Sequence, residues 1–160
     1  MSIRYMQLIT ERYLRLGYQP YRWFAADTEP AWQALNKPLP EVTVGMLSTS
    51  GAYALGQVAY HYKDDTSIRT ILSAIAESNL RFSHITENYL VSAKRDPNCI
   101  FPLRALRQLV TEGFIGRVAD RFFSCMGGVY SQRRVREEVA PALLAGFRAQ
   151  QVDVALLVAM

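Results

Sequence analysis

The chain has 160 residues, of which 50% are hydrophobic and 20% are charged, a composition that fits one globular domain with a sizeable core. Its formal net charge is +4, but the basic residues are scattered, and this argues against a nucleic-acid binder, which usually carries a basic stripe. Cys99 and Cys125 lie far apart without a CxxC partner, so we expect neither a disulfide scaffold nor a zinc site, and a reducing, cytoplasmic setting is favoured.

Most of the basic residues are arginine, and their densest group is Arg133, Arg134 and Arg136. Glu137 and Glu138 follow at once, which favours a solvated helix face. An anionic substrate or an acidic partner stays open as the alternative, because guanidinium groups suit bidentate binding of carboxylates. The first residues show no apolar region and no small-residue cleavage site, so no secretory signal is expected.

The N-terminal part of the sequence predicts two helices. Over residues 2–16 apolar side chains recur at helical spacing, Ser2 is a suitable N-cap, and Gly17 is a suitable stop. The aromatic segment 18–24 also contains arginine and could stack on bases, but packing of an irregular segment onto a core is favoured. A second helix is expected over residues 27–36, because cap residues and an early proline open it.

The first buried strand is expected over residues 41–49, where most residues are apolar. Ser48, Thr49 and Ser50, followed by Gly51, form the loop after it. Small hydroxyl groups and backbone N–H groups after a parallel strand can hold an anion. An ordinary turn is the alternative, because these residues match neither a GxGxxG nor a Walker A motif.

Short elements are expected in the middle of the chain: an irregular lid or short helix over residues 54–62, and strands over 68–72 and 80–84. His84 lies at the exit of the last of these. A histidine in such a place can act as an acid, a base or a hydrogen-bond donor near neutral pH. A structural role is the alternative for a single histidine.

The C-terminal part predicts helices that alternate with strands. Helix 103–112 is followed by strand 118–125 and by a long helix over 131–151, in which Pro141 would cause a kink or a break. The run of apolar residues over 152–160 predicts a strand buried on both faces of a parallel sheet. A transmembrane span needs roughly 20 apolar residues, so this run is too short to be one.

This order of elements favours an α/β fold, a parallel sheet with Rossmann-like or flavodoxin-like layering, as a single domain over residues 1–160. In such sheets ligands gather beyond the carboxyl ends of the strands. Cys125 would lie at one such end, as a reactive thiol or as a buried, inert one. Gly127 and Gly128 then permit a close backbone approach or a tight turn. The end of the last strand, at Met160, either precedes an active-site loop or is an ordinary terminus.

Six stretches of the chain, in this order, resemble the selenoprotein B family of glycine, sarcosine, betaine and D-proline reductases, and the D-proline-reductase-like branch is nearest. They are Leu47–Tyr53, Ser67–Ile71, Leu80–His84, Asp96–Leu103, Gly113–Gly116 and Phe123–Gly127. No single stretch is specific to the family, whereas the ordered set is. Residues 72–79 depart from the family, in which a proline-containing turn would be expected after Ile71.

The resemblance implies reductive cleavage of a C–N bond in a small amino acid or an N-methylated relative, with electrons from a dithiol. It also implies a selenocysteine, or a cysteine in its place, in a loop after the final strand. We therefore expect the chain to be the N-terminal part of a longer reductase subunit, cut where a selenocysteine codon was taken as a stop, with a sheet incomplete at its C-terminal side. A short, non-catalytic binding or structural module is the alternative. A nucleotide-binding domain ranks last, because a glycine-rich fingerprint is missing.

With this resemblance, Ser48, Thr49 and Ser50 are candidates for binding the substrate carboxylate, and His84 is a candidate proton donor. The nucleophile is expected beyond Met160, so the chain alone should be inactive; no metal and no cofactor are expected within it. The expected partners are other reductase subunits and a small amino acid, in a cytoplasmic oligomer that binds neither nucleic acid nor membrane. If the last strand is internal to a larger sheet, the 160-residue chain should expose an apolar patch or an open strand edge.

Overall fold

The computed structural model describes residues 4–20 and 25–160, in two compact units, Met1–Gln33 and Ala34–Met160. The single domain predicted over residues 1–160 stays a prediction. The first unit contains helix α1 (Tyr5–Arg15), none of whose residues is buried. Gly17 ends this helix with φ +82°, as predicted. Ser2 and residues 21–24 of the predicted aromatic segment lie outside the described residues.

The helix predicted over residues 27–36 does not form, so that prediction is wrong. The segment is irregular and exposed throughout, and Trp32 is 91% exposed. A helix of about ten residues is marginal in water unless one of its faces packs against a partner. Cap residues and proline signal where a helix can start, but they do not supply that packing.

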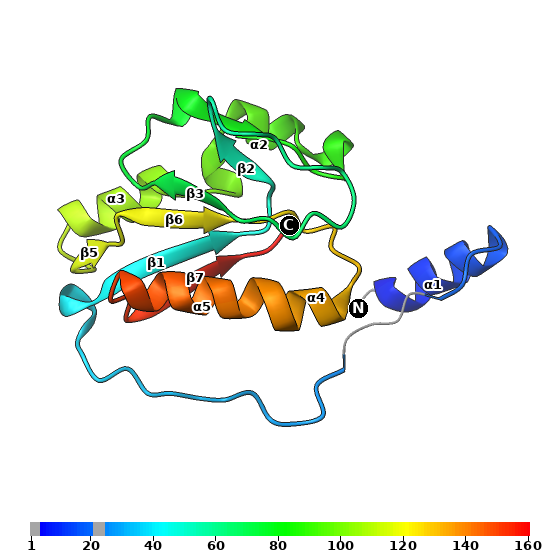
Figure 1. The fold of residues 1–160 in the computed structure, drawn as a ribbon, viewed down its shortest axis with the longest axis horizontal. Helices are drawn as coiled ribbons and strands as arrows, with labels where there is room; N and C mark the ends of the chain where they lie inside the picture. Colours follow the sequence, from blue (N-terminus) through cyan, green and yellow to red (C-terminus); the bar gives the residue numbers. More distant parts are fainter. Residues whose placement is uncertain (1–3, 21–24) are drawn as a thin grey trace. The chain divides into compact units, whose positions relative to one another are not determined.

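A five-stranded sheet lies at the centre of the second unit (Figure 1). Its strands are β1 (Thr43–Ser48), β3 (Arg69–Leu72), β5 (Arg117–Val118), β6 (Arg121–Ser124) and β7 (Val154–Val158). β1 pairs in parallel with β5, β6 and β7, and β3 pairs antiparallel with β6. β7 pairs with residues of β1 that also pair with β5 and β6, so it must lie on the other side of β1.

Helices cover both faces of this sheet. Successive residues of a strand point to opposite faces, so a strand can supply side chains to two separate apolar clusters. The cluster that includes α3 (Leu103–Thr111) contains Val44, Met46, Phe101, Leu103, Leu106 and Phe122. The cluster that includes α5 (Ala140–Ala149) contains Leu47, Phe123, Val139, Leu143 and Phe147. The predicted α/β class with a layered, Rossmann-like or flavodoxin-like sheet is therefore confirmed.

The long helix predicted over residues 131–151 has three parts. They are α4 (Gln132–Arg134), the π-helical turn η5 (Val135–Val139) and α5. Ser131 caps the start, since its hydroxyl accepts from Arg134 N–H at 3.3 Å. Pro141 has no N–H to donate to the preceding turn, and the helix changes type directly before it instead of breaking.

Smaller elements link the strands of the sheet. β2 (Ala52–Ala54) and β4 (Leu80–Phe82) form a separate antiparallel pair, and residues between 55 and 68 are irregular. The remaining elements are η1 (Leu39–Glu41), η2 (Glu77–Asn79), η3 (Glu87–Tyr89), α2 (Val91–Arg95) and η4 (Pro97–Cys99). None of the described helices is both long and apolar enough to cross a membrane.

The prediction that the last strand is buried on both faces is wrong. Ala155, Leu156 and Leu157 of β7 are exposed, and Leu157 is 67% exposed. Among the described residues β7 pairs only with β1, so it forms an edge of the sheet. The structure therefore has an open, apolar strand edge at β7.

Candidate functional site

The candidate site lies at the end of the sheet where the carboxyl ends of β1, β6 and β7 meet (Figure 1). Ser48 ends β1 and pairs with Ser124 on β6 and with Val158 on β7. The connection from β1 to β6 includes α3, and the connection from β6 to β7 includes α5 on the opposite face. The winding therefore reverses at β1, and such switch points leave a crevice in which α/β proteins bind ligands.

Ser48 and Ser50 form a buried hydroxyl pair in the loop after β1. Ser48 Oγ donates to the carbonyl oxygen of Ile100 at 2.7 Å and lies 2.7 Å from Ser50 Oγ. Because a hydroxyl group has one proton, Ser48 Oγ accepts from the Ser50 hydroxyl, and it also accepts from Ser50 N–H at 3.3 Å. Both side chains are fully buried, so the pair ties the loop to the segment that precedes α3.

Thr49, between the two serines, bonds to the end of β7. Its N–H donates to the carbonyl oxygen of Val158 at 3.0 Å, and its hydroxyl oxygen accepts from Met160 N–H at 2.9 Å. The Thr49 side chain is only partly buried. Among the three candidates for carboxylate binding it is thus the one that solvent still reaches, and this role of the three residues stays a prediction.

Two backbone hydrogen bonds bring His84 to the same carboxyl end of the strands. Gly51 N–H donates to the carbonyl oxygen of Cys125 at 3.0 Å, and Ser83 N–H donates to that of Gly51 at 3.0 Å. Gly51 has φ +65°, and a Cβ atom there would lie 2.0 Å from Ser83 O, so this approach requires glycine. His84 follows Ser83 directly and is 7% exposed.

The ring of His84 is held between Thr86 and Gly127. Thr86 N–H donates to His84 Nδ1 at 3.1 Å, and Thr86 Oγ1 lies 2.6 Å from the same nitrogen. On the other side of the ring, a Cβ atom built on Gly127 would lie 2.8 Å from His84 Nε2, 2.9 Å from Met160 O and 3.0 Å from Thr49 O. The absence of a side chain at Gly127 therefore allows these segments to converge.

Residues 66–160 match the model of a family described as glycine/sarcosine/betaine reductase selenoprotein B (GRDB). The chain belongs to this family. It is 28% identical over 143 residues to the D-proline reductase subunit gamma of Acetoanaerobium sticklandii, across 89% of this chain and 59% of that protein. The chain thus spans less than two thirds of that relative's length. No solved structure matches the chain. The predicted family is confirmed, and the relative agrees with the predicted D-proline-reductase-like branch.

Most of the stretches that carry the family resemblance come together at the site. Leu47–Tyr53 contacts Leu80–His84 and Phe123–Gly127 through the backbone bonds of Gly51, and it contacts Asp96–Leu103 through the bond from Ser48 to Ile100. Gly113–Gly116 lies at the opposite end of β1, where a Cβ atom on Gly116 would lie 2.9 Å from Val42 O. Four of the six stretches therefore meet at the carboxyl end of β1, and Gly113–Gly116 packs at its amino end.

The two cysteines of the chain differ in exposure. Cys125, just after β6, is 7% exposed, and burial raises the pKa of its thiol to about 11. It is therefore protonated at neutral pH, which favours the buried, inert interpretation over a reactive thiolate. Cys99 is exposed at the end of η4. In the described part of the chain, no three His, Cys, Asp or Glu side chains gather as metal ligands would.

Sequence reasoning missed Tyr60, which anchors the irregular segment after β2 to the site. Its hydroxyl donates to the carbonyl oxygen of Ser124 at 2.6 Å and accepts from Arg69 N–H at 3.1 Å. The Arg69 guanidinium carbon lies 4.3 Å from the centre of the ring. Burial raises the pKa of Tyr60 to about 12. No periodic pattern surrounds this residue, so the sequence held no signal that it is buried.

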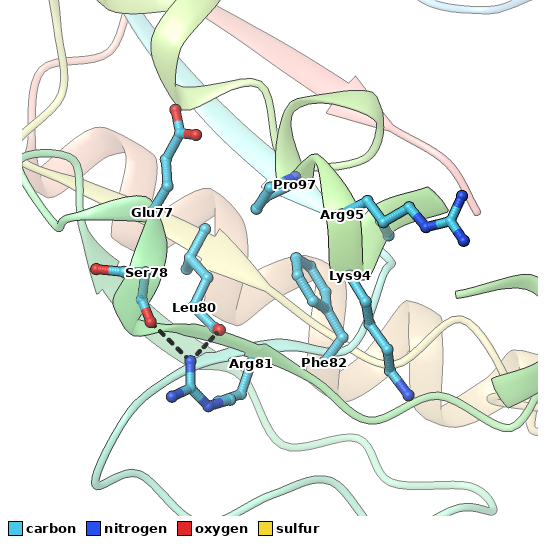
Figure 2. Close-up of a pocket in the computed structure, with 9 residues that line it drawn as sticks. Glu77, Ser78, Leu80, Arg81, Phe82, Lys94, Arg95 and Pro97 are labelled. Atoms are coloured by element: carbon cyan, nitrogen blue, oxygen red, sulfur yellow. Dashed lines mark hydrogen bonds between the residues drawn. The ribbon is translucent and has the colours of Figure 1, made fainter. Parts of the chain in front are cut away.

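A pocket of about 420 Å³ lies between β4 and the segment around α2 (Figure 2). It is lined by Glu77, Ser78, Leu80, Arg81, Phe82, Ala93, Lys94, Arg95 and Pro97. Leu80, Phe82 and Pro97 form its apolar centre, whereas Arg95 extends away from it (Figure 2). Arg81 is held by bonds to the carbonyl oxygens of Ser78 at 2.8 Å and Leu80 at 2.7 Å. None of these residues was predicted as a site residue.

Proposed function

We propose that this chain forms the substrate-positioning scaffold of a reductase subunit that cleaves a C–N bond in a small amino acid or an N-methylated derivative, of the D-proline, glycine, sarcosine or betaine type. Membership of the selenoprotein B family supports the reaction class. The convergence of His84, Thr49, Gly127 and the end of β7 at the switch point is the observation that carries the proposal.

The proposed reaction breaks the C–N bond and leaves one hydrogen on each of the two separated atoms. A dithiol supplies two electrons and two protons and becomes a disulfide. In this proposal His84 donates a proton through Nε2 to the leaving nitrogen. Thr49 and the loop around it bind the substrate carboxylate, while the buried hydroxyls of Ser48 and Ser50 hold that loop in place.

The redox-active group is proposed to lie outside this chain. Cys125 is buried and its thiol has a pKa raised to about 11, so it is a poor source of thiolate. A selenocysteine, or a cysteine in its place, in a segment after β7 would supply the nucleophilic atom. The end of β7 approaches Gly127 and His84, which supports a site completed from that direction. In this proposal the chain is the N-terminal part of a longer, cytoplasmic subunit that assembles with other reductase subunits.

The nucleotide sequence after the Met160 codon tests this part of the proposal first. A TGA codon followed by an open frame that encodes a nearby cysteine is expected. A TAA or TAG codon at that position would overturn it. The full-length product, assembled with its partner subunits and a dithiol, should then cleave D-proline or one of the other named amino acids.

Variants of the two histidines test the role of His84 in that assembly. His84→Gln should lower kcat by about a hundredfold or more, the usual loss for a general acid. His61→Gln is the matched control, because His61 is exposed and belongs to the irregular segment after β2. Equal activity of the two variants would show that His84 has no catalytic role.

The second candidate is a non-catalytic binding or structural module of such a complex. The exposed, apolar edge at Leu156 and Leu157 favours it, because an open strand edge is a surface on which another chain can pair. This module should bind reductase subunits without turning over an amino acid. An intact open frame after Met160 together with turnover would exclude it.

A further inference from the structure

We infer that Thr86 is a positioning residue that fixes His84 in the tautomer with its proton on Nε2, directed at Gly127. The catalytic meaning of this inference rests on the proposed function, whereas the tautomer is a property of the chain that can be measured without it. Thr86 was not among the residues predicted from the sequence.

The hydrogen bonds at His84 Nδ1 decide the tautomer. A backbone N–H can only donate, so the bond from Thr86 N–H to Nδ1 at 3.1 Å makes that nitrogen an acceptor. A neutral imidazole carries one N–H, and it must then be on Nε2. With Nδ1 unprotonated, the Thr86 hydroxyl, whose oxygen lies 2.6 Å from Nδ1, can donate to the same nitrogen.

The same contacts also fix the orientation of the ring. Turning the imidazole by half a rotation would bring a carbon atom to the position of Nδ1, and both bonds from Thr86 would be lost. Tyr89 N–H donates to Thr86 O at 2.9 Å, so the backbone of Thr86 is itself held at the start of η3. His84 is 7% exposed, and within this packing the local turn determines where Nε2 points.

The direction of Nε2 gives the tautomer its meaning. The position of a Cβ atom on Gly127 lies 2.8 Å from His84 Nε2 and 2.9 Å from Met160 O, so Nε2 lies next to Gly127 and close to the residues just after β7. With the proton on Nε2, His84 presents a donor to that place. With the proton on Nδ1, it would present an acceptor and could not act as the proton donor.

Long-range ¹H–¹⁵N correlation spectra of the chain, recorded where the imidazole rings are neutral, test the tautomer. The spectra contain only His61 and His84, since the chain has two histidines, and the exposed His61 serves as an internal reference. His84 should show a protonated Nε2 and an unprotonated Nδ1. The opposite pattern would overturn the inference, whatever the activity of the reductase.

Two substitutions separate positioning from folding. Thr86→Val keeps the backbone N–H but removes the hydroxyl, which can bond to Nδ1 in either tautomer, so Nε2–H should stay the major form while the ring loses its fixed orientation. Thr86→Ser should restore that orientation. A switch to Nδ1–H in a folded Thr86→Val chain would show that the backbone N–H does not set the tautomer.

The assembled reductase supplies the catalytic readout. Thr86→Val should lower kcat on the order of tenfold with little change in KM, and Thr86→Ser should recover most of that loss. A normal tautomer preference combined with full activity of His84→Gln would defeat the proposed function while leaving the inference about the ring intact.

Discussion

At the amino end of β1 one acidic side chain joins three parts of the chain, whereas at the carboxyl end four segments bury their polar groups against each other. Asp153 accepts from Thr43 N–H at 2.9 Å and from Lys37 Nζ at 2.8 Å. The side chains of Lys37 and Asp153 remain 49% and 22% exposed. Solvent therefore screens the charges at the amino end of β1. Bringing these parts of the chain together costs little free energy of desolvation.

The carboxyl end contains polar groups that solvent hardly reaches. Ser48 and Ser50 are fully buried, and His84 is 7% exposed. Ser124 Oγ is buried with no hydrogen-bond partner among the described residues. Burying polar groups costs free energy unless they are hydrogen-bonded, and Ser124 does not meet that condition.

The two ends of β1 therefore differ in role: the amino end joins parts of the chain, and the carboxyl end positions buried polar groups. Local exceptions to the rules of folding are expected at functional sites and are compensated elsewhere. The amino end follows those rules, and the carboxyl end is where the exception lies. The two ends should therefore respond differently to substitution.

The largest effect is expected for Gly51→Ala at the carboxyl end. Its Cβ atom would lie 2.0 Å from Ser83 O, at a φ of +65° that non-glycine residues rarely adopt. Backbone must move to relieve the contact, so the free energy of unfolding should fall by about 3 kcal/mol or more in urea denaturation.

Gly56→Ala is the matched control for this variant. Gly56 has φ +93°, but no atom lies within 4 Å of a Cβ atom built there. Only the backbone strain remains, and the loss of stability should be about 1–2 kcal/mol. Equal losses in the two variants would show that crowding against Ser83 does not hold the loop.

The elements that sequence predicted well are those whose burial follows a period. Helix α3 and the strand that became β1 were expected close to their observed bounds, because each packs one continuous apolar pattern against the core. The loop after β1 and His84 were also identified as candidates. The family resemblance contributed here, because with it Ser48, Thr49 and Ser50 became candidates for carboxylate binding and His84 a candidate proton donor.

The parts that sequence could not predict depend on long-range packing. The apolar run of β7 predicts that a strand forms, but it does not predict which neighbours cover that strand. The exposure of Leu157 was therefore missed. Residues 27–36 have helix signals without a packing partner. Tyr60 is buried through bonds to Ser124 and Arg69, which are remote in sequence, and the antiparallel pairing of β3 with β6 is equally remote.

The second prediction concerns the buried hydroxyl pair. Ser48→Ala leaves the carbonyl oxygen of Ile100 and the hydroxyl of Ser50 without this partner, and the free energy of unfolding should fall by about 2 kcal/mol. Ser73→Ala is the control, because its hydroxyl bonds to Asp120 O on the exposed surface and should change stability by less than about 0.5 kcal/mol. Similar losses for the two serines would argue that burial does not distinguish the carboxyl end.

A smaller effect is expected for Tyr60→Phe. The ring and its contact with Arg69 remain, but the bonds to Ser124 O and from Arg69 N–H are lost. Stability should fall by about 1–1.5 kcal/mol in chemical denaturation. Tyr62→Phe, at a ring that is 64% exposed, should be close to neutral, and a loss as large as that at Tyr60 would contradict the proposed anchoring.

The smallest effect is expected at the amino end, where Asp153→Asn tests the exposed ion pair. Hydrogen bonds from Lys37 and from Thr43 N–H hold the pKa of Asp153 below its ordinary value. The ionised carboxylate therefore stabilises the fold above its unfolded pKa of about 4, and this contribution disappears as the pH falls through the lower, folded value. Asp153→Asn should lower Tm slightly at neutral pH and make its decline in acid shallower. Asp120→Asn is the control, because the described bonds of Asp120 involve only its backbone, and it should leave Tm at neutral pH unchanged. A variant at Asp153 that follows the same acid profile as the wild type would mean that this carboxylate does not join the amino end of β1.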